Sequence, residues 1–459
     1  MGRIGSEDNP LRVAVIGSGP SGFYATEALL KSGLRVRVDM LERLPVPYGL
    51  VRSGVAPDHP KLKQVIEVYA KIAESPDFNY IGHVTVGRDI SIGELRASHH
   101  AVILTCGAES DRNLGIPGET MPGSHTATEF VGWYNGHPDY RDRAFDLSHE
   151  TAVVIGQGNV AADVARILAK SEQELAHTDI AEHALSQLAA SKVRTIFVVG
   201  RRGPAQAKFT PKELREFGEL EHCDAVVDES ELELNDASRV ELDDKTNPGA
   251  RKIYDQFREF AARRVSGKLR RVIFTFLKSP VELLGDGRLA RIRLEKNVLS
   301  GGPFNQGAHG TGKTMDIDAG IVLRSIGYRG VALPDVPFDS RSGVIPNVEG
   351  RVTKGGETMP QVYAAGWIKR GPTGIIGTNR ADSVATVNSL LSDLAALDSG
   401  SAKRGTEAIY ECLRRKGVRF LTFSDWKVLD KREIERGQPK GKPREKFTRV
   451  QEMLAQLDQ

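Results

Sequence analysis

Apolar runs of strand character alternate with helical periodicity along most of the chain. The first apolar run, residues 12–16, leads into the turn GSGPSG, and a helix is expected over 23–32. A second run over 34–41 follows that helix, and AVILT at 101–105 forms a further one. Continuous apolar runs are typical of parallel strands that are covered on both faces. The first part of the chain is therefore predicted to be a βαβ-rich, doubly wound α/β unit.

The glycines of the first turn have the spacing GxGxxG, which is typical of dinucleotide-binding sites. Gly17 permits the tight turn, Gly19 has no Cβ to block a pyrophosphate, and Gly22 lets the helix pack closely on the strand. The second strand ends at Glu42, about twenty residues past the last glycine, where this fingerprint places an acid that binds ribose hydroxyls. These four residues together predict a dinucleotide site.

The same pattern begins again near residue 151. The β-type run 151–155 leads into GQGNVA, and a helix is expected over 162–169. The next strand, 193–199, comes after a helical insertion and ends in Gly-Arg-Arg, with Arg201 and Arg202 where the first unit has an acid. A carboxylate would repel a 2′-phosphate, whereas guanidinium groups bind it with charge-assisted bonds. The second site is therefore expected to take NADP(H), and the acid-terminated first site suits FAD.

Other segments carry weaker signals. A glycine-rich loop over 366–378 lies between an expected strand and an expected helix, and it is predicted to return the chain to the first domain beside a bound ligand. The segment 224–247 is acidic and is expected to form a hairpin, and the charged tail from residue 400 is expected to pack only in part. From residue type alone, His59 is more simply a structural residue at a helix start. The glutamates near 213–219 are more simply a solvated helix face.

Composition excludes several classes of protein. The chain has 459 residues, 40% hydrophobic and 27% charged, with a net charge of +3, so two or three ordinary globular domains are expected. The three cysteines form no CxxC, which argues against a local redox disulfide and against a zinc or iron–sulfur run, and no metal site is expected. The mild charge gives no indication of nucleic-acid binding. No apolar run suits a membrane helix or a secretory signal, so a cytoplasmic protein without membrane insertion is expected.

Six segments together resemble the NADPH-ferredoxin reductases of the adrenodoxin reductase type, in particular their bacterial branch. They are VIGSGPSGFY, PYGLVRSGVAPDHPK, VIGQGNVAADVAR, VGRRGPAQAKFTPKELRE, RSIGYRG and GWIKRGPTGIIGTNRAD, and the resemblance runs from about residue 11 to 390. It implies two doubly wound, Rossmann-like α/β domains of the glutathione reductase-like kind. An FAD domain would comprise 1–112 and 330–459, and an NADP domain, 113–329, would be inserted in it.

The resemblance also implies roles for individual residues. It implies FAD contacts at Gly17, Ser18, Gly19, Gly22, Glu42, Leu50, Val86, Trp367, Gly374, Ile375 and Ile376. It implies NADP contacts at Arg112, Gln157, Gly158, Asn159, Val160, Arg201, Arg202 and Glu213, with Gly374 shared. It places His59 and Glu216 near the stacked nicotinamide and flavin, in positioning and proton management, and so reverses the preference that residue type alone supports.

The implied activity is that of a ferredoxin–NADP(+) reductase. A hydride passes from NADPH to the flavin, and electrons then pass singly to a ferredoxin, an acidic iron–sulfur protein that would dock on Lys268, Arg270 and Arg271. A monomer or weak dimer is expected. The alternatives are another FAD- and NADPH-dependent enzyme, such as a monooxygenase, and the electron-transfer subunit of a larger complex.

Overall fold

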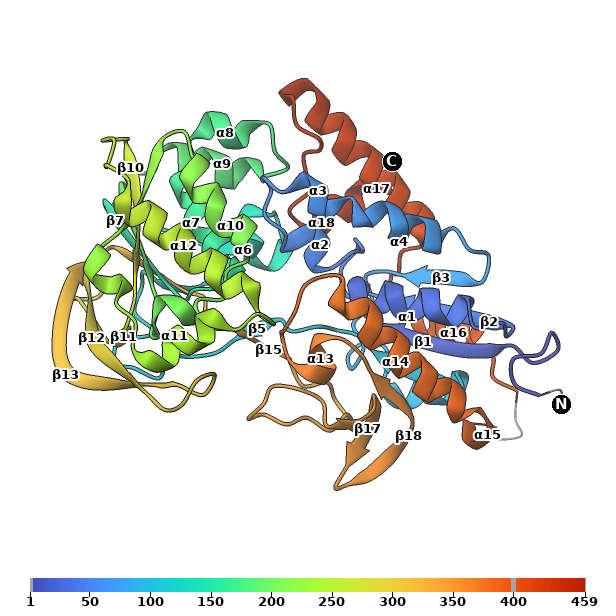
Figure 1. Cartoon of the computed structure of the whole chain (residues 1–459). Coiled ribbons are helices and arrows are strands. Elements are labelled where there is room, and N and C mark those ends of the chain that lie inside the picture. The colour runs from blue at the N-terminus through green and yellow to red at the C-terminus, as the bar shows by residue number, and fades with distance from the viewer. Residues whose placement is uncertain (1–2, 398–401, 459) are drawn as a thin grey trace. The chain divides into compact units, whose positions relative to one another are not determined.

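The computed structural model describes residues 3–397 and 402–458, and the chain divides into two compact units. Unit 1 comprises Met1–Val55, His59–Asp111 and Gly327–Gln459, and unit 2 comprises Ala56–Asp58 and Arg112–Ile326. Each unit is built around its own parallel sheet (Figure 1). The prediction of two doubly wound Rossmann-like units is therefore confirmed.

The sheet of unit 1 has seven strands in the order β16-β17-β18-β4-β1-β2-β3. The parallel part is formed by β1 (Leu11–Ile16), β2 (Val36–Leu41), β3 (Phe78–Ile81), β4 (Ala101–Leu104) and the end of β18 (Glu357–Ala364), and β16 (Asn347–Val348) and β17 (Arg351–Lys354) extend it antiparallel. The order β3-β2-β1-β4 places the end of β1 at the point where the strand order reverses. Ligands bind at such a point in open α/β sheets.

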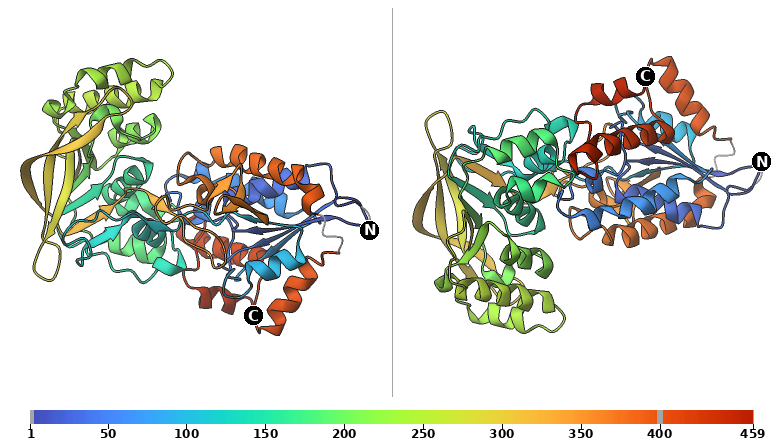
Figure 2. Two further views of the ribbon diagram at one scale, coloured as in Figure 1. Left: turned by 90° about the horizontal axis from the view of Figure 1, so that it is seen from below. Right: turned by 90° about the horizontal axis from the view of Figure 1, so that it is seen from above.

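Helices cover both faces of this sheet (Figure 2). The helices of unit 1 are α1 (Pro20–Leu30), α2 (Leu50–Ser53), α3 (Pro60–Lys63), α4 (Val65–Ala73), α5 (Ile92–Ser98), α13 (Trp367–Arg370), α14 (Thr378–Ser392), α15 (Leu394–Leu397), α16 (Thr406–Arg415), α17 (Phe423–Gly437) and α18 (Val450–Gln456). Helix α14 lies against α1, where Ser383 Oγ donates to the carbonyl of Ser21 at 3.0 Å. The segment 366–378 leads into this helix and belongs to unit 1.

The charged tail, which was expected to pack only in part, contributes residues to the core of unit 1. Trp426 and Leu429 of α17 are buried in the main hydrophobic cluster of unit 1, and Trp426 packs edge-on against Tyr48. One charged residue of the tail, Glu433, is completely buried and pairs with Arg52. Charge content alone is therefore a poor guide to packing where the charges neutralise one another.

The main sheet of unit 2 has six strands in the order β6-β14-β7-β8-β10-β9, all parallel. They are β6 (Ser124–Thr126), β7 (Thr151–Ile155), β8 (Thr195–Val199), β9 (Cys223–Val227), β10 (Arg270–Thr275) and β14 (Ile321–Arg324). The helices are α6 (Ala127–Tyr134), α7 (Asn159–Ala169), α8 (Glu172–Ala176), α9 (Glu182–Ala189), α10 (Pro211–Glu216), α11 (Asp236–Asp243) and α12 (Pro248–Ala262). The hairpin expected over 224–247 is wrong, because β9 pairs in parallel with β10 and α11 follows it.

A second, antiparallel sheet belongs to unit 2. It has the order β11 (Lys278–Leu284), β12 (Arg291–Ser300) and β13 (Gly307–Asp318), and Figure 2 shows it as a long twisted yellow ribbon. Residues 301–306 connect β12 to β13. In the part of the chain that the structure describes, no helix is both long and apolar enough to cross a membrane.

The chain leaves unit 1 and returns to it along a two-stranded ribbon. Strand β5 (Ser110–Asp111) pairs antiparallel with β15 (Tyr328–Arg329), and Ser110 Oγ donates to the carbonyl of Arg329 at 3.1 Å. The connections on either side of the segment 112–326 are thereby joined at their unit 1 ends.

Candidate dinucleotide-binding sites

The glycine turn of unit 1 has the shape that a phosphate group requires. Gly17 has φ +104°, and a Cβ there would lie 2.8 Å from the carbonyl oxygen of Thr105. A Cβ on Gly22 would lie 2.2 Å from the carbonyl oxygen of Gly17, whereas one on Gly19 would meet nothing within 4 Å. The turn is therefore closely packed behind and open in front, where Gly19 precedes the first N–H groups of α1. This open space fits the pyrophosphate of a dinucleotide.

Glu42 lies at the end of β2 and is bonded to this turn. Its Oε2 accepts hydrogen bonds from Ser18 N at 3.1 Å and from Ser18 Oγ at 2.6 Å, and its Oε1 accepts one from Leu44 N at 3.0 Å. Ser18 is completely buried, while Glu42 is half-buried. The carboxylate therefore keeps one side toward solvent, where ribose hydroxyls could reach it.

The glycine-rich loop over 366–378 contains a hydrogen-bond donor, Trp367 Nε1, that has no partner among the described residues. Trp367 begins α13 and stacks on Tyr328 with ring centroids 5.5 Å apart. Its Nε1 is buried and has no hydrogen-bond partner among the described residues. A buried N–H without an acceptor is costly, so it marks a place where a bound ring acceptor fits. Gly374 has φ +81°, and Ile375, which follows it, is 63% exposed.

The other residues that the sequence predicts as FAD contacts differ in their exposure to solvent. Leu50 begins α2 with its side chain 37% exposed, and Ile376 is half-buried. Val86 is 7% exposed, within the hydrophobic cluster beneath the other face of the sheet.

The glycine turn of unit 2 repeats the first one. Gly156 has φ +128°, and a Cβ there would lie 2.1 Å from the carbonyl oxygen of Ser325, whereas one on Gly158 would meet nothing within 4 Å. Gln157 Nε2 donates to the carbonyl of Thr275 at 3.0 Å, and Asn159 Oδ1 accepts from Thr210 N at 2.8 Å. The side chains of this turn thus hold neighbouring loops, and the backbone in front of Gly158 stays open.

Two arginines follow β8. Arg201 is exposed and Arg202 half-buried, and neither forms an ion pair with another described residue. Val160 is half-buried at the first turn of α7, and Arg112 is exposed where unit 2 begins. Two guanidinium groups without a carboxylate partner at this strand end suit a 2′-phosphate.

A charge cluster beneath α10 was not predicted from the sequence. Arg166 is 1% exposed, and its guanidinium donates to Asp58 at 2.7 and 3.0 Å, to Asp163 at 2.7 Å and to Glu213 at 3.3 Å. Its Nη1 also lies 3.7 Å from an oxygen of Glu216. The only signal in the sequence is an arginine among the apolar positions of the helix 159–169.

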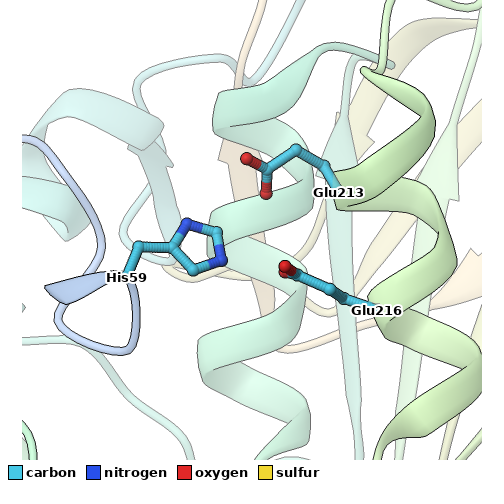
Figure 3. Close-up of side chains that lie close together, drawn as sticks. All are labelled: His59, Glu213 and Glu216. Carbon is cyan, nitrogen blue, oxygen red and sulfur yellow. The ribbon is translucent and has the colours of Figure 1, made fainter. Parts of the chain in front are cut away.

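The cluster fixes the carboxylates and the backbone next to His59. Burial alone would raise the pKa of Asp58, but the hydrogen bonds and charge of Arg166, with Lys170 at 2.9 Å, outweigh burial and hold that pKa well below its usual range. Figure 3 shows the side chains of Glu213 and Glu216, which come from α10, and that of His59, which directly follows Asp58 and precedes α3.

The three basic residues expected at a docking surface differ in their accessibility. Arg270 is 7% exposed and donates to the carbonyls of Val193, Ala169 and Lys170, so its inclusion among surface docking residues is wrong. Arg270 lies at the start of β10, and its guanidinium bonds the carbonyls at the end of α7 and before β8. Lys268 donates through Nζ to the carbonyl of Leu220, and Arg271 is exposed with its Nε bonded to Thr195 Oγ1.

Comparisons with known proteins agree with this geometry. Residues 11–197 match the family model described as pyridine nucleotide-disulphide oxidoreductase. The chain is 44% identical to the NADPH-ferredoxin reductase FprA of Mycobacterium tuberculosis, over 97% of this chain and 98% of that protein. It is 42% identical to the mitochondrial NADPH:adrenodoxin oxidoreductase of Arabidopsis thaliana, over 98% and 96%.

A solved structure extends the likeness to three dimensions. The complex of Mycobacterium tuberculosis FprA with NADPH superposes with a TM-score of 0.92 at 44% identity and covers 97% of this chain and 99% of that one. The matches cover at least 96% of each of these relatives. The chain belongs to the family of NADPH-ferredoxin reductases and NADPH:adrenodoxin oxidoreductases.

Proposed function

We propose that this protein is a flavoprotein that oxidises NADPH and passes the electrons to an iron–sulfur protein of the ferredoxin class. One observation carries the proposal. The second strand of unit 1 ends in a carboxylate, Glu42, whereas the second strand of unit 2 ends in two arginines without ion-pair partners. The two dinucleotide units thus carry opposite charge at the same point of the same fold, so they suit two different nucleotides.

Unit 1 is assigned to FAD, with the domain taken as 1–112 and 330–459. Gly17, Ser18, Gly19 and Gly22 would receive the pyrophosphate, and Glu42 the ribose hydroxyls. Leu50, Val86, Trp367, Gly374, Ile375 and Ile376 complete the set of proposed contacts. The open space before Gly19 and the unpartnered Nε1 of Trp367 support this assignment. When bound, FAD would supply the chemistry that accepts a hydride and releases electrons one at a time.

Unit 2 is assigned to NADP, with the domain taken as 113–329. The turn Gln157, Gly158, Asn159 and Val160 would receive the pyrophosphate, and Arg201 and Arg202 the 2′-phosphate, with Arg112, Glu213 and the shared Gly374 as further contacts. The unpaired guanidinium groups give the preference for NADPH over NADH, because each phosphate oxygen can take a charge-assisted bond there.

His59 and Glu216 are proposed to orient the nicotinamide and to hold a proton near it. Arg166 binds Asp58, the residue before His59, and lies 3.7 Å from Glu216, so one buried cation restrains both neighbourhoods. A histidine titrates near neutral pH and a carboxylate accepts hydrogen bonds, which suits them for these two tasks.

The electron acceptor is proposed to be an acidic ferredoxin that docks near Lys268 and Arg271 of a cytoplasmic enzyme that is monomeric or weakly dimeric. Opposite surface charge raises the association rate in a salt-dependent way. Exchanging Lys268 and Arg271 for Glu would therefore slow ferredoxin reduction at low salt, with flavin reduction by NADPH unchanged. An equal rate in both proteins would remove this docking site.

The experiment that tests the function is anaerobic stopped-flow spectroscopy of the purified protein, with NADPH and NADH as separate reductants. We expect the flavin absorbance to bleach at a much lower concentration of NADPH than of NADH. In the variant R201A/R202A the Michaelis constant for NADPH is expected to rise far more than that for NADH. A colourless protein, or equal effects of the substitutions on both nucleotides, would contradict the proposal.

A further inference from the structure

The loop that carries the two arginines is held by hydrogen bonds to three of its successive carbonyl groups. In this loop, 200–203, the oxygen of Gly200 accepts from Lys278 N at 3.0 Å and that of Arg202 accepts from Leu277 N at 3.0 Å. Between them, the oxygen of Arg201 accepts from Asn297 Nδ2 at 2.8 Å. The three acceptors are consecutive residues. The donors are Leu277, just before β11, Lys278 of β11 and Asn297 of β12. The backbone of both arginines is therefore fixed by the antiparallel sheet.

Asn297 is the one side chain among these donors. It lies in β12 at the register shift after Glu295, and it is 2% exposed. Its Nδ2 also donates to Ser279 Oγ at 2.8 Å, and its backbone N donates to the carbonyl of Leu277 at 2.7 Å. One asparagine thus joins β12, the turn before β11 and the arginine loop.

The turn that Asn297 holds is itself a conformation that needs support. Leu277 has φ +52°, which is unfavourable for a branched side chain. Its N–H donates to Arg202 while its carbonyl accepts from Asn297, so the strained residue is bonded on both sides. Without these two bonds nothing would hold the turn in this conformation, and the arginine loop would lose Leu277 N, one of its three donors.

We infer that Asn297 is a positioning residue for recognition of the 2′-phosphate and that the β11–β13 sheet is the platform that presents Arg201 and Arg202. The inference rests on the proposed function of the two arginines. A bidentate bond to phosphate requires a guanidinium plane of defined direction, and a fixed backbone lowers the entropy lost when that bond forms. Asn297 acts through the carbonyl of Arg201, to which its Nδ2 donates.

The test compares three variants of the holoprotein. Asn297→Ala removes the two side-chain hydrogen bonds, to Arg201 and Ser279, and keeps the backbone bond to Leu277. Asn297→Asp keeps the volume but places an acceptor against the carbonyl of Arg201. Asn305→Ala is the control, because Asn305 is exposed in the same hairpin. We expect both Asn297 variants to raise the Michaelis constant for NADPH about tenfold, the scale of one lost hydrogen bond, with the kcat and the Michaelis constant for NADH changed less than about twofold. Asn305→Ala is expected to match the wild type.

A binding measurement separates positioning from general damage. Isothermal titration with 2′,5′-ADP and with 5′-AMP reports the 2′-phosphate alone, without turnover. We expect the Asn297 variants to lose about tenfold in affinity for 2′,5′-ADP and to keep their affinity for 5′-AMP. Equal losses for both nucleotides, or for NADPH and NADH, would assign Asn297 a merely structural role and overturn the inference. If Asn297→Ala does not fold, Asn297→Asp decides by the same criterion.

The experiments distinguish failure of the 2′-phosphate site from failure of the positioning role of Asn297. If R201A/R202A leaves the preference for 2′,5′-ADP intact, the assignment of the 2′-phosphate site is wrong. If R201A/R202A abolishes that preference and the Asn297 variants leave it intact, only the positioning role is wrong.

Discussion

Arg52 and Glu433, 381 positions apart, form a bidentate ion pair in which Nη1 and Nη2 donate to Oε2 and Oε1 at 2.9 and 2.5 Å. The carboxylate of Glu433 is completely buried and also accepts from Phe447 N at 3.0 Å. Arg52 lies in α2, two residues after Leu50, a proposed flavin contact. The pair therefore holds helix α17 of the tail against the loop that is expected to line the FAD.

The first prediction concerns this pair. Glu433→Gln leaves the guanidinium of Arg52 without its buried counter-charge, so we expect the free energy of unfolding to fall by about 3 kcal/mol. Because α2 is released with it, FAD should dissociate at a lower temperature. Thermal unfolding, followed by the rise of flavin fluorescence on release, measures both effects.

Glu435→Gln is the matched control, since Glu435 lies on the same helix with its side chain 56% exposed and pairs with Lys431 at 3.7 Å. An exposed pair of this kind contributes about 0–1 kcal/mol. If the two variants released FAD at the same temperature, the buried pair would have no special role.

The fold and the glycine turns could be predicted because their determinants are local. A strand, a turn with fixed glycine spacing and a helix occupy only residues 11–30 in unit 1 and 151–169 in unit 2, so the pattern can be read from a short stretch of sequence. The charge at Glu42 and at Arg201 is visible for the same reason.

The charge clusters could not be predicted, because their members are distant in sequence. Nothing near Glu433 indicates Arg52 as its partner, and Arg166 interrupts an apolar helix face without showing what it binds. The failure at 224–247 has a related cause, since an edge strand such as β9 gains its pairing from β10, more than 40 residues away. Asn297 likewise reveals its function only through contact with a loop 96 positions earlier.

The second prediction concerns retention of the flavin. Glu42→Ala removes the acceptor that holds Ser18 N and Oγ, and with it the proposed partner of the ribose hydroxyls. We expect the affinity for FAD to fall by tenfold or more, the scale of one or two charge-assisted bonds of about 1.5–3 kcal/mol each. Equilibrium titration of the deflavinated protein with FAD measures this. Glu67→Ala on α4, where the side chain is exposed, should bind FAD as the wild type does.

The third prediction concerns acid stability. Hydrogen bonds from Lys416, together with those from Ser91 and Cys412, lower the pKa of Glu94 to about 2 against burial, from an ordinary value of 4.5. A lowered pKa in the folded state means that the carboxylate contributes stability above about pH 4.5 and loses it as the pH falls toward 2. Glu94→Gln should therefore be less stable at pH 7, and its stability should depend less on pH between 4.5 and 2.

Urea unfolding at several pH values between 7 and 2.5 follows this difference. Glu411→Gln is the control, because the side chain of Glu411 is 61% exposed. Its stability curve should run parallel to that of the wild type. Parallel curves for Glu94→Gln as well would show that Glu94 does not titrate with the lowered pKa.

The last prediction concerns Arg166, the buried cation of unit 2. Its guanidinium is within 4 Å of Asp58, Asp163, Glu213 and Glu216, so Arg166→Met would leave several carboxylates facing one another without a counter-charge. We expect the free energy of unfolding to fall by about 3–5 kcal/mol. Arg166→Lys should recover only part of this loss, because one ammonium cannot reproduce the fork that bonds both oxygens of Asp58.

The double variant Arg166→Met with Asp58→Asn distinguishes charge from packing. If uncompensated charge is the cause, neutralising Asp58 should restore part of the stability that Arg166→Met removes. This recovery should shrink as the pH falls, because the remaining carboxylates then take up protons and repel one another less. Denaturation at pH 7 and pH 5 measures both quantities. Strictly additive losses at both pH values would instead show that the guanidinium stabilises unit 2 through its volume, and the restraint it places on Glu216 and on the backbone before His59 would then need another source.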